Sequence, residues 1–475
     1  MENAGKTKKE FVKAIFCAPT GRYEEYGFPS RLTDDVFKKL KEAGINRIFG
    51  FGWDNRDETK IKTLELCEKY GIAYLPSLDS FGQYIALGSK EKKGFDKWGK
   101  EETLQADAKM MEEVRKYLPY KAFKGVFFGD EAGYLSLNGV AHAKEVFSKN
   151  FPDLEFHFNF FSYSINEPIF WGGMELSRNP SMEYSKPFEL DEDHKIAFEN
   201  RFRFYDMLVS HLLDQAKFEF VSQDKYPFEA FWKEVPTSVH VALFELNAYF
   251  AEKKKKYGYR FYNYLQAGQW GAGSNRQHMS EGEMLLQTNV TIGYGHEGYS
   301  YFPGCFPIDF AFSPELDFAK NGASSLIDIN GKPGEVYPFV KEEQEFVSLI
   351  EDDILNSKFL GVSSYGGYDN GFEEEEICSL PDNECIFRGK LPNFVRYEDP
   401  SFKTSSTNEI MVSTFVKDSK KRYFITNLSS VYGNEVDISL PDGYSLIQGA
   451  HESRFAGNVH LSLKPGEAAY LIQED

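Results

Sequence analysis

Short strand-like runs alternate with helix-like segments along the first two thirds of the chain, and this alternation restricts the folds that it can adopt. Several runs are near-continuous stretches of apolar and aromatic residues, which is typical of parallel strands buried on both faces. The eight runs are VKAIFCAPT (12–20), INRIFGFGW (45–53), IAYLPSLD (72–79), FKGVFFGDEAG (123–133), LEFHFNFF (154–161), FEFVSQDKYPF (218–228), YRFYNYLQAG (259–268) and VTIGYGHEGYSYF (290–302). We therefore predict an α/β fold, an eight-fold (β/α) TIM barrel.

The segments between the runs carry helix patterns. Residues 34–45 and 58–72 have apolar residues at helical spacing and a glycine near the end, and residues 191–215 form a longer amphipathic pattern with acids in its first turn. An open doubly wound sheet is the structural alternative. It is less favoured because no glycine-rich nucleotide-binding turn follows the first strand.

The sequence changes in character after residue 302. A loop rich in Pro, Gly and Phe leads to one last helix-like segment at 336–355, and strand-like runs separated by Gly, Asn and Asp turns follow from residue 356. These features predict two domains, a (β/α)8 barrel over residues 1–355 and a small all-β sandwich over residues 356–475.

Composition and charge restrict the class of partner. The 475 residues include 73 acids and 54 bases, a formal net charge of −19. Nucleic acids and anionic membranes need a basic surface, so we expect neither as a partner, whereas a small neutral or cationic molecule fits. No leader pattern follows Met1 and no apolar stretch reaches the length of a membrane span, so we expect a cytoplasmic protein with reduced thiols. The oligomeric state is left open.

Polar residues gather at the ends of the predicted strands, where a barrel of this kind carries its chemistry. The fourth run ends in Asp130 and Glu131, and the sixth contains Asp224. These three carboxyls are the candidate catalytic groups because neighbouring carboxyls can divide into acid and base or nucleophile. Aromatic faces, amides and further acids near the strand ends would suit a sugar ring and its hydroxyls. These candidate substrate-binding residues are Trp53, Asp54, Asp79, Asn159, Tyr226, Gln266, Trp270, His296 and Glu297.

Each candidate also has a structural interpretation. Asp130 and Glu131 could cap the following helix, and Asp224 could belong to an Asx-turn. Residues that could serve packing alone are Trp53, Trp270, His157 and His296, and Glu297 could face a helix outside the barrel. No cluster of His, Cys and acids has metal-ligand spacing, so no metal and no cofactor is predicted.

The order of the motifs resembles that of bacterial glycoside hydrolases with a catalytic barrel and a C-terminal β-sandwich. The motifs are GVFFGDEAG (125–133), DKYPF (224–228), YNYLQAG (262–268) and TIGYGHEGYSYF (291–302). The resemblance implies hydrolysis of an O-glycosidic bond. Ala132 stands where many of these enzymes have Pro, and Gln266 stands on the seventh strand, where the largest retaining clan has its nucleophilic Glu. The two-Glu mechanism of that clan is therefore not expected.

Three mechanisms remain open. In the first, Glu131 is the general acid and Asp224 or Asp130 is the second carboxylate. The second resembles β-N-acetylhexosaminidases, in which an Asp such as Asp130 orients the acetamido group of the substrate and the adjacent Glu protonates the leaving oxygen. The third resembles α-galactosidases, with Asp130 as nucleophile and Asp224 as acid/base. We favour Glu131 as the acid, acting on a small oligosaccharide or glycoside.

Two other classes of function are kept as alternatives. A non-catalytic carbohydrate-binding barrel would present aromatic residues at its rim without opposed carboxylates. A metal-assisted hydrolase or isomerase would use His157, Asp224 and His296 as ligands.

Overall fold

The computed structural model describes residues 9–50, 54, 56–86, 95–161, 167–178, 186, 201–228, 241–268, 279–306, 325–366 and 395–474. Within this part of the chain, eight parallel strands lie in the order β3-β2-β1-β8-β7-β6-β5-β4. They are β1 (Val12–Phe16), β2 (Arg47–Gly50), β3 (Ala73–Pro76), β4 (Gly125–Asp130), β5 (Glu155–Phe160), β6 (Phe220–Asp224), β7 (Arg260–Gln266) and β8 (Gly298–Phe302). Isolated parallel bridges from Tyr74 to Phe123 and from Ser77 to Phe127 close the ring between β3 and β4.

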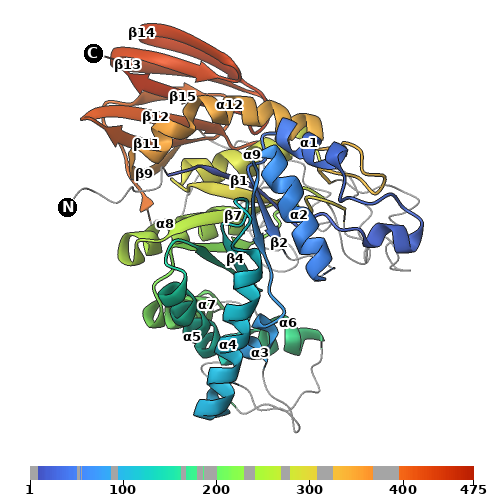
Figure 1. Cartoon of the computed structure of the whole chain (residues 1–475). Coiled ribbons are helices and arrows are strands. Elements are labelled where there is room, and N and C mark those ends of the chain that lie inside the picture. Colours follow the sequence, from blue (N-terminus) through green and yellow to red (C-terminus); the bar gives the residue numbers. More distant parts are fainter. Residues whose placement is uncertain are drawn as a thin grey trace, which may run out of the picture.

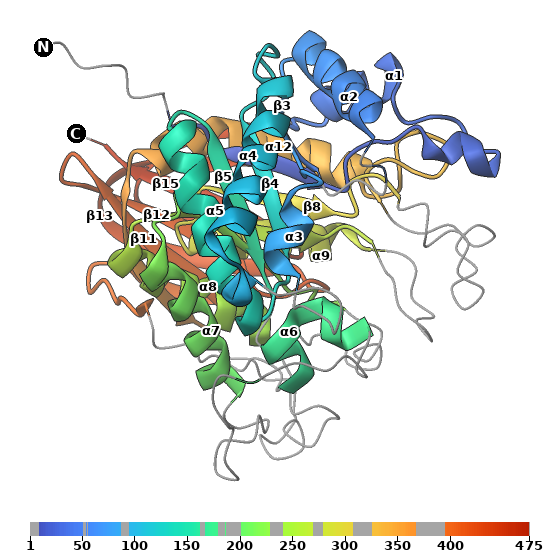
Figure 2. The same cartoon turned by 60° about the horizontal axis from the view of Figure 1, so that its bottom comes forward.

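Helices cover the outside of this ring (Figure 1). They are α1 (Asp34–Glu42), α2 (Asp57–Tyr70), α3 (Phe81–Ile85), α4 (Lys100–Tyr117), α5 (Leu137–Asn150), α6 (Glu167–Arg178), α7 (Arg201–Gln215), α8 (Val241–Tyr257), α9 (Glu281–Gly293) and α12 (Tyr337–Leu355). Helix α5 packs between α3 and α7 on one side of the barrel (Figure 2). The predicted (β/α) barrel is confirmed. None of the described helices combines the length and the apolar character that a membrane crossing needs.

Aromatic rings fill the interior of the barrel. Phe16, Phe49, Phe127, Tyr262 and Tyr264 belong to one buried cluster inside the ring of strands, distinct from the larger core between strands and helices. A good part of the aromatic content, 16% of the chain, is therefore packing rather than a surface for ligands.

The predicted eighth strand is wrong in its first half. Residues 290–293 are the last turn of α9, and β8 begins only at Gly298. Every residue of α9 from Gly282 to Gly293 is buried, so the helix has no polar face and its sequence shows no helical period. Val290, Thr291 and Ile292 are β-branched and resemble a strand. The Thr291 hydroxyl instead donates to the carbonyl of Gln287 one turn earlier, at 2.9 Å.

The C-terminal part is all-β, as predicted. Within residues 358–366 and 395–474, seven strands form one antiparallel sheet in the order β10-β13-β15-β12-β11-β9, with β14 on β13. They are β9 (Lys358–Tyr365), β10 (Lys403–Ser406), β11 (Ile410–Lys417), β12 (Lys420–Asn427), β13 (Asn434–Gln448), β14 (His451–Leu463) and β15 (Ala468–Gln473). The sheet curls into a sandwich, because the first half of β13 and the second half of β14 share a core with β11, β12 and β15.

The face of this sheet that points away from the sandwich core packs on the barrel through α9 and α12 (Figure 1). Met411, Phe424 and Tyr470 join the core of the barrel rather than the core of the sandwich. Asn289 of α9 donates to the carbonyl of Gly466 at 3.0 Å. The domain boundary at residues 355 and 356 falls between α12 and β9, and it stays a prediction because one continuous core joins the two parts.

Candidate functional site

Strands β4, β5 and β6 end in polar residues that meet at the carboxyl-terminal rim of the barrel. Along β5 and β6, alternate residues face inward, so Asn159 follows His157 and Asp224 follows Ser222 on the inner face. Strand β4 has an irregular register between Phe127 and Gly129, which sets Asp130 beside Asn159. This extra residue is a β-bulge, and it turns Asp130 toward the interior of the barrel.

Glu131 follows β4 in a left-handed backbone conformation, with φ of 52°. Its N–H donates to the carbonyl of Asn159 at 3.1 Å. The turn lies against Gly173 of α6, where an added Cβ would come within 2.1 Å of the Glu131 carbonyl oxygen. Left-handed conformations of residues other than glycine are costly and cluster at functional sites. Here the turn breaks the alternation of a strand, so that both Asp130 and Glu131 lie near Tyr226, whose pKa their charges raise.

Asp224 is a buried carboxyl with a strongly raised pKa. Burial raises its pKa from the ordinary value to about 6, and hydrogen bonds to Glu131, Tyr226 and Asn159 lower it only in part. A hydrogen bond between two carboxyl groups requires a proton on one of them, because an ionised carboxylate can only accept. Glu131 and Asp224 therefore form a proton-sharing pair.

Asn159 links this pair to Asp130. Its Nδ2 donates to Oδ1 of Asp130 at 2.8 Å, and it also forms a hydrogen bond with Asp224. Its Oδ1 accepts from the hydroxyl of Ser222 at 2.6 Å, and that hydroxyl lies 2.9 Å from Nε2 of His157. Asn159, Ser222 and His157 are fully buried. A chain of hydrogen bonds thus runs from the interior of the barrel to the rim carboxyls.

Gln266, at the end of β7, holds the loop that follows β6. Its side-chain oxygen accepts from the backbone N–H of Phe228 at 2.9 Å, and its own backbone N–H donates to Gln287 of α9 at 2.7 Å. Gln266 is 2% exposed. It acts on Tyr226 indirectly, by fixing the backbone two residues further along.

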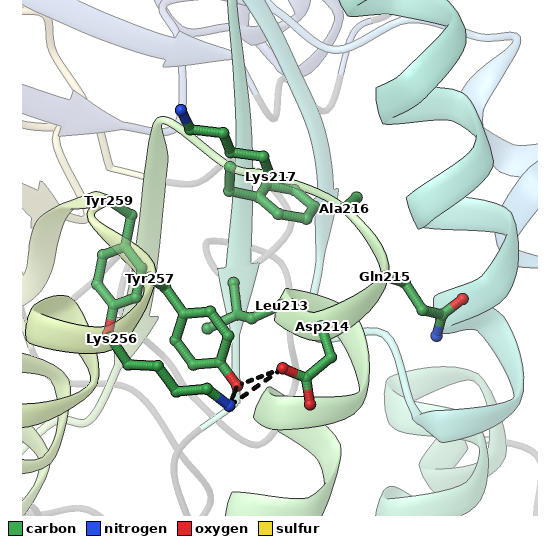
Figure 3. A pocket seen from close by; sticks show the side chains of 9 residues that line it. Leu213, Asp214, Gln215, Ala216, Lys217, Lys256, Tyr257 and Tyr259 are labelled. Carbon is green, nitrogen blue, oxygen red and sulfur yellow. Dashed lines mark hydrogen bonds and ion pairs between the residues drawn. The ribbon is translucent and has the colours of Figure 1, made fainter.

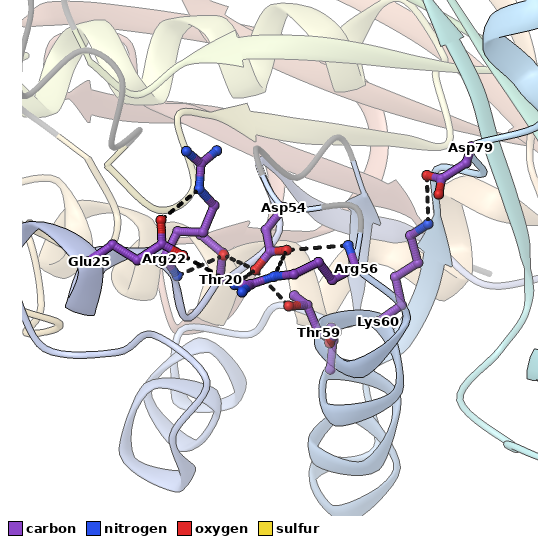
Figure 4. A network of polar contacts seen from close by, with 9 residues as sticks. Thr20, Arg22, Glu25, Asp54, Arg56, Thr59, Lys60 and Asp79 are labelled. Carbon is purple, nitrogen blue, oxygen red and sulfur yellow. Dashed lines mark hydrogen bonds and ion pairs between the residues drawn. The ribbon is translucent and has the colours of Figure 1, made fainter.

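Asp54 and Asp79 are engaged elsewhere (Figure 4). Asp54 accepts hydrogen bonds from Thr20 at 2.9 Å, Thr59 at 2.6 Å and Arg56 at 2.7 Å. These bonds hold its pKa well below the usual range although burial opposes them. Asp79 lies 3.3 Å from the ammonium of Lys60. Both carboxylates connect the segments after β2 and β3 to helix α2, and their contact with a substrate stays a prediction.

His296 and Glu297 lie at the opposite end of the barrel, which corrects their placement among the rim residues. They precede β8, so they stand at its amino-terminal end. Nε2 of His296 lies 3.0 Å from the carbonyl of Asn247, and Glu297 pairs with Lys254. The error follows from the eighth strand, whose predicted start lay eight residues too early. Trp53 and Trp270 lie outside the described residues.

Sequence reasoning missed the contributions of Ser222 and Tyr264. Tyr264 lies inside the barrel. Burial raises its pKa, and the charges of Asp130 and Asp224 raise it further. The alternation of side chains along a strand could have indicated both residues. Ser222 and Tyr264 stand two positions before the predicted rim residues Asp224 and Gln266, so they face the same side of their strands.

A surface pocket lies at the other end of the barrel (Figure 3). Its lining comes from the last turns of α7 and α8 and the residues that follow them, and it includes Asp214, Lys256 and Tyr257. Lys256 and Tyr257 both donate to Asp214, at 3.1 and 2.8 Å. These bonds join the ends of α7 and α8, so the pocket is separate from the three rim carboxyls. No group of three or more His, Cys, Asp or Glu residues in the described ranges is arranged to hold a metal ion.

No family model matches the chain. No curated protein matches it in sequence either. Solved structures with a similar arrangement include a β-galactosidase from the psychrophilic Marinomonas ef1, at 9% identity and a TM-score of 0.45 over 73% of this chain and 60% of that one. A β-galacturonidase from Eisenbergiella tayi gives 14% identity and a TM-score of 0.41, over 70% of this chain and 51% of that one.

An α-L-arabinofuranosidase from Thermotoga maritima gives 10% identity and a TM-score of 0.46, over 98% of this chain and 96% of that one. The chain thus spans about half to three fifths of the lengths of the galactosidase and the galacturonidase. The assignment of the barrel rests on the observed order of its strands.

Proposed function

We propose that this protein is a glycoside hydrolase whose acid is the proton-sharing pair Glu131–Asp224 and whose second carboxylate is Asp130. The observation that carries this proposal is the hydrogen bond between Glu131 and Asp224 beside a third carboxyl, at the rim where barrels of this kind carry their chemistry. Glycosidases need one carboxyl that keeps its proton near neutral pH and another that is ionised. We assign the first role to the Glu131–Asp224 pair and the second to Asp130.

The roles follow from the surroundings of each group. Burial favours the neutral form of Asp224, so the pair retains a proton up to a pH of about 6 and can deliver it to the glycosidic oxygen. Asp130 accepts a hydrogen bond from Asn159, which favours its ionised form. Asp130 can then attack the anomeric carbon, position a water or orient a substrate acetamido group, as in the three mechanisms above.

The test begins with turnover of aryl glycosides by the wild-type protein. The panel covers α- and β-linked hexoses, pentoses and N-acetylhexosamines, and the anomer of the product is read by NMR. Retention on ordinary sugars supports Asp130 as nucleophile, inversion supports a water-mediated route, and turnover restricted to N-acetylhexosamines supports the substrate-assisted route. Activity on short glycosides but not on polysaccharide would support the small substrate, which is also part of the proposal.

Three variants then test the residues, namely Glu131→Gln, Asp224→Asn and Asp130→Asn. We expect kcat/KM to fall by about 10²–10⁴-fold in each, since a positioned acid or base contributes about this much. Asp214→Asn is the matched control, because this carboxylate accepts from Lys256 and Tyr257 at the opposite end of the barrel and should leave kcat/KM unchanged. Binding of sugars by the wild type without turnover of any glycoside would instead identify a non-catalytic carbohydrate-binding barrel.

The dependence of activity on pH follows from the raised pKa of Asp224. Because the acid acts in its protonated form, kcat/KM should fall as the pH rises through about 6. A rate that is constant from pH 5 to 8 would contradict the role of this pair as the acid.

A further inference from the structure

The structure orients the hydrogen-bond chain beneath the rim, with Oδ1 of Asn159 toward Ser222 and Nδ2 toward Asp130. Oδ1 of Asn159 can only accept, so the hydroxyl of Ser222 must donate its single proton to it, at 2.6 Å. The oxygen of Ser222 is then left to accept from Nε2 of His157, at 2.9 Å. His157 therefore carries its proton on Nε2.

The surroundings of His157 keep its imidazole ring neutral. The ring is fully buried and stacked on Phe49 and Tyr262, with centroids 4.4 and 5.8 Å away. Burial, together with the positive charge of Arg47, lowers the pKa of His157 to about 3. The imidazole is thus neutral near neutral pH, and the bond to Ser222 assigns its one ring proton to Nε2.

Ser222 and Asp130 lie at opposite ends of the Asn159 amide. With Oδ1 held by Ser222, Nδ2 points to Oδ1 of Asp130 at 2.8 Å. A reversed amide would place its oxygen against a carboxylate, which is repulsive and would favour protonation of Asp130. The titratable groups around this amide lie at the ends of β4 and β6 and on β7, and they are Asp130, Glu131, Asp224, Tyr226 and Tyr264.

We propose that His157 and Ser222 are positioning residues, which hold the Asn159 amide so that Asp130 stays ionised and the shared proton stays on the Glu131–Asp224 pair. This inference extends the proposed function, since it explains how three neighbouring carboxyls divide into one acid and one base. It does not depend on the identity of the substrate, because the distribution of protons is a property of the free protein.

The experiment is an NMR titration of the protein with ¹³C-labelled aspartate carboxyls, in which Asp130→Asn and Asp224→Asn assign the two signals. In Ser222→Ala the amide can reverse, and we expect the apparent pKa of Asp130 to rise by about one pH unit. Ser222→Thr keeps the hydroxyl and should restore the wild-type titration. Ser300→Ala is the matched control, since Ser300 is also fully buried on a barrel strand and its hydroxyl has no partner in the described part of the chain.

An unchanged Asp130 titration in Ser222→Ala would overturn the inference. If that variant does not fold, His157→Phe gives the same test, because phenylalanine retains the stacking on Phe49 and removes the donor to Ser222. In an active protein, the acid limb of the kcat/KM profile should move with the Asp130 titration while KM changes little. A protein that cleaves no glycoside but shows the expected titrations would refute the proposed function and leave this inference standing.

Discussion

The two ends of the barrel both bury charged groups, but they stabilise them in opposite ways. At the amino-terminal end, cations meet anions: Arg47 pairs with Glu155, Lys254 with Glu297, and Lys13 lies 2.6 Å from Glu351. At the carboxyl-terminal end, Glu131 and Asp224 are bonded to each other and to neutral donors. At the amino-terminal end, opposite charges neutralise each other. At the carboxyl-terminal end, one of the two carboxyls has to stay protonated.

The charged groups at the amino-terminal end stabilise the fold, whereas those at the carboxyl-terminal end lower its stability. A buried charge with a partner of opposite sign becomes costly only when that partner is removed. Acids that share a proton are costly in the intact protein, and such strain is typical of sites where function opposes stability. Substitutions at the two ends should therefore change stability in opposite directions.

The largest expected effect is at the amino-terminal end. Arg47→Met removes a buried guanidinium and leaves the partly buried Glu155 without its ion-pair partner, so the free energy of unfolding should fall by about 3–5 kcal/mol. Urea denaturation at pH 7 measures it. The double variant Arg47→Met/Glu155→Gln should recover much of the loss, and Lys62→Met, in an exposed pair with Glu65, should cost less than about 0.5 kcal/mol. A cost for Arg47→Met as small as that of Lys62→Met would remove one side of the comparison.

The next effect concerns Glu343 of α12, whose side chain is 6% exposed between the barrel and the sandwich. Burial, and secondly the charge of Glu467, raises its pKa to about 8. Stability from its protonated form is fully present below a pH of about 4.5 and is lost as the pH rises through 8. Glu343→Gln keeps the neutral shape, so it should unfold at higher temperature than wild type at pH 8, by about 3–4 kcal/mol in stability, and match it at pH 4.5.

Calorimetry of Glu343→Gln at several pH values also separates Glu343 from Asp224. Both groups have a raised pKa, so both make the stability of the protein fall as the pH rises. If the two proteins show the same dependence on pH, Glu343 is ionised without cost and the trend belongs to the rim.

The smallest effect is at the rim. Asp224 titrates in the folded state at about 6, above its ordinary value, so its stabilising contribution is present below pH 4 and lost as the pH rises through 6. Asp224→Asn has no charge to bury and should be more stable than wild type by about 1–3 kcal/mol at pH 8, measured in the Glu343→Gln background. A destabilised Asp224→Asn at pH 8 would mean that the rim resembles the other end of the barrel.

The sequence predicted the barrel because its parallel strands are apolar on both faces and stand out as continuous runs. It located Asp130, Glu131 and Asp224 at the rim for the same reason. Alternation counted from Phe127 would turn Glu131 inward and Asp130 outward. The β-bulge that turns Asp130 inward has no local signal, because Gly129 permits a bulge without requiring one.

The errors at His296 and Glu297 have a different origin. Helix α9 is enclosed by the strands on one side and by the sandwich on the other, so tertiary packing removed the polar face by which a helix is recognised. The position of the following strand was then misjudged, and with it the end of the barrel to which both residues belong. Interactions between distant parts of the chain, rather than local propensity, decide such cases.

The burial of α9 also bears on how this protein could be divided or recombined. Its inner side holds Gln266 through Gln287, and its outer side carries Asn289 against Gly466. A barrel expressed without residues 356–475 would expose the apolar outer side of this helix to water and would be expected to aggregate. An exchange of sandwiches between related chains would have to preserve the close approach of Gly282 to Ser430, where an added Cβ would lie 2.3 Å from a carbonyl oxygen. The barrel and the sandwich should therefore be expressed and exchanged together.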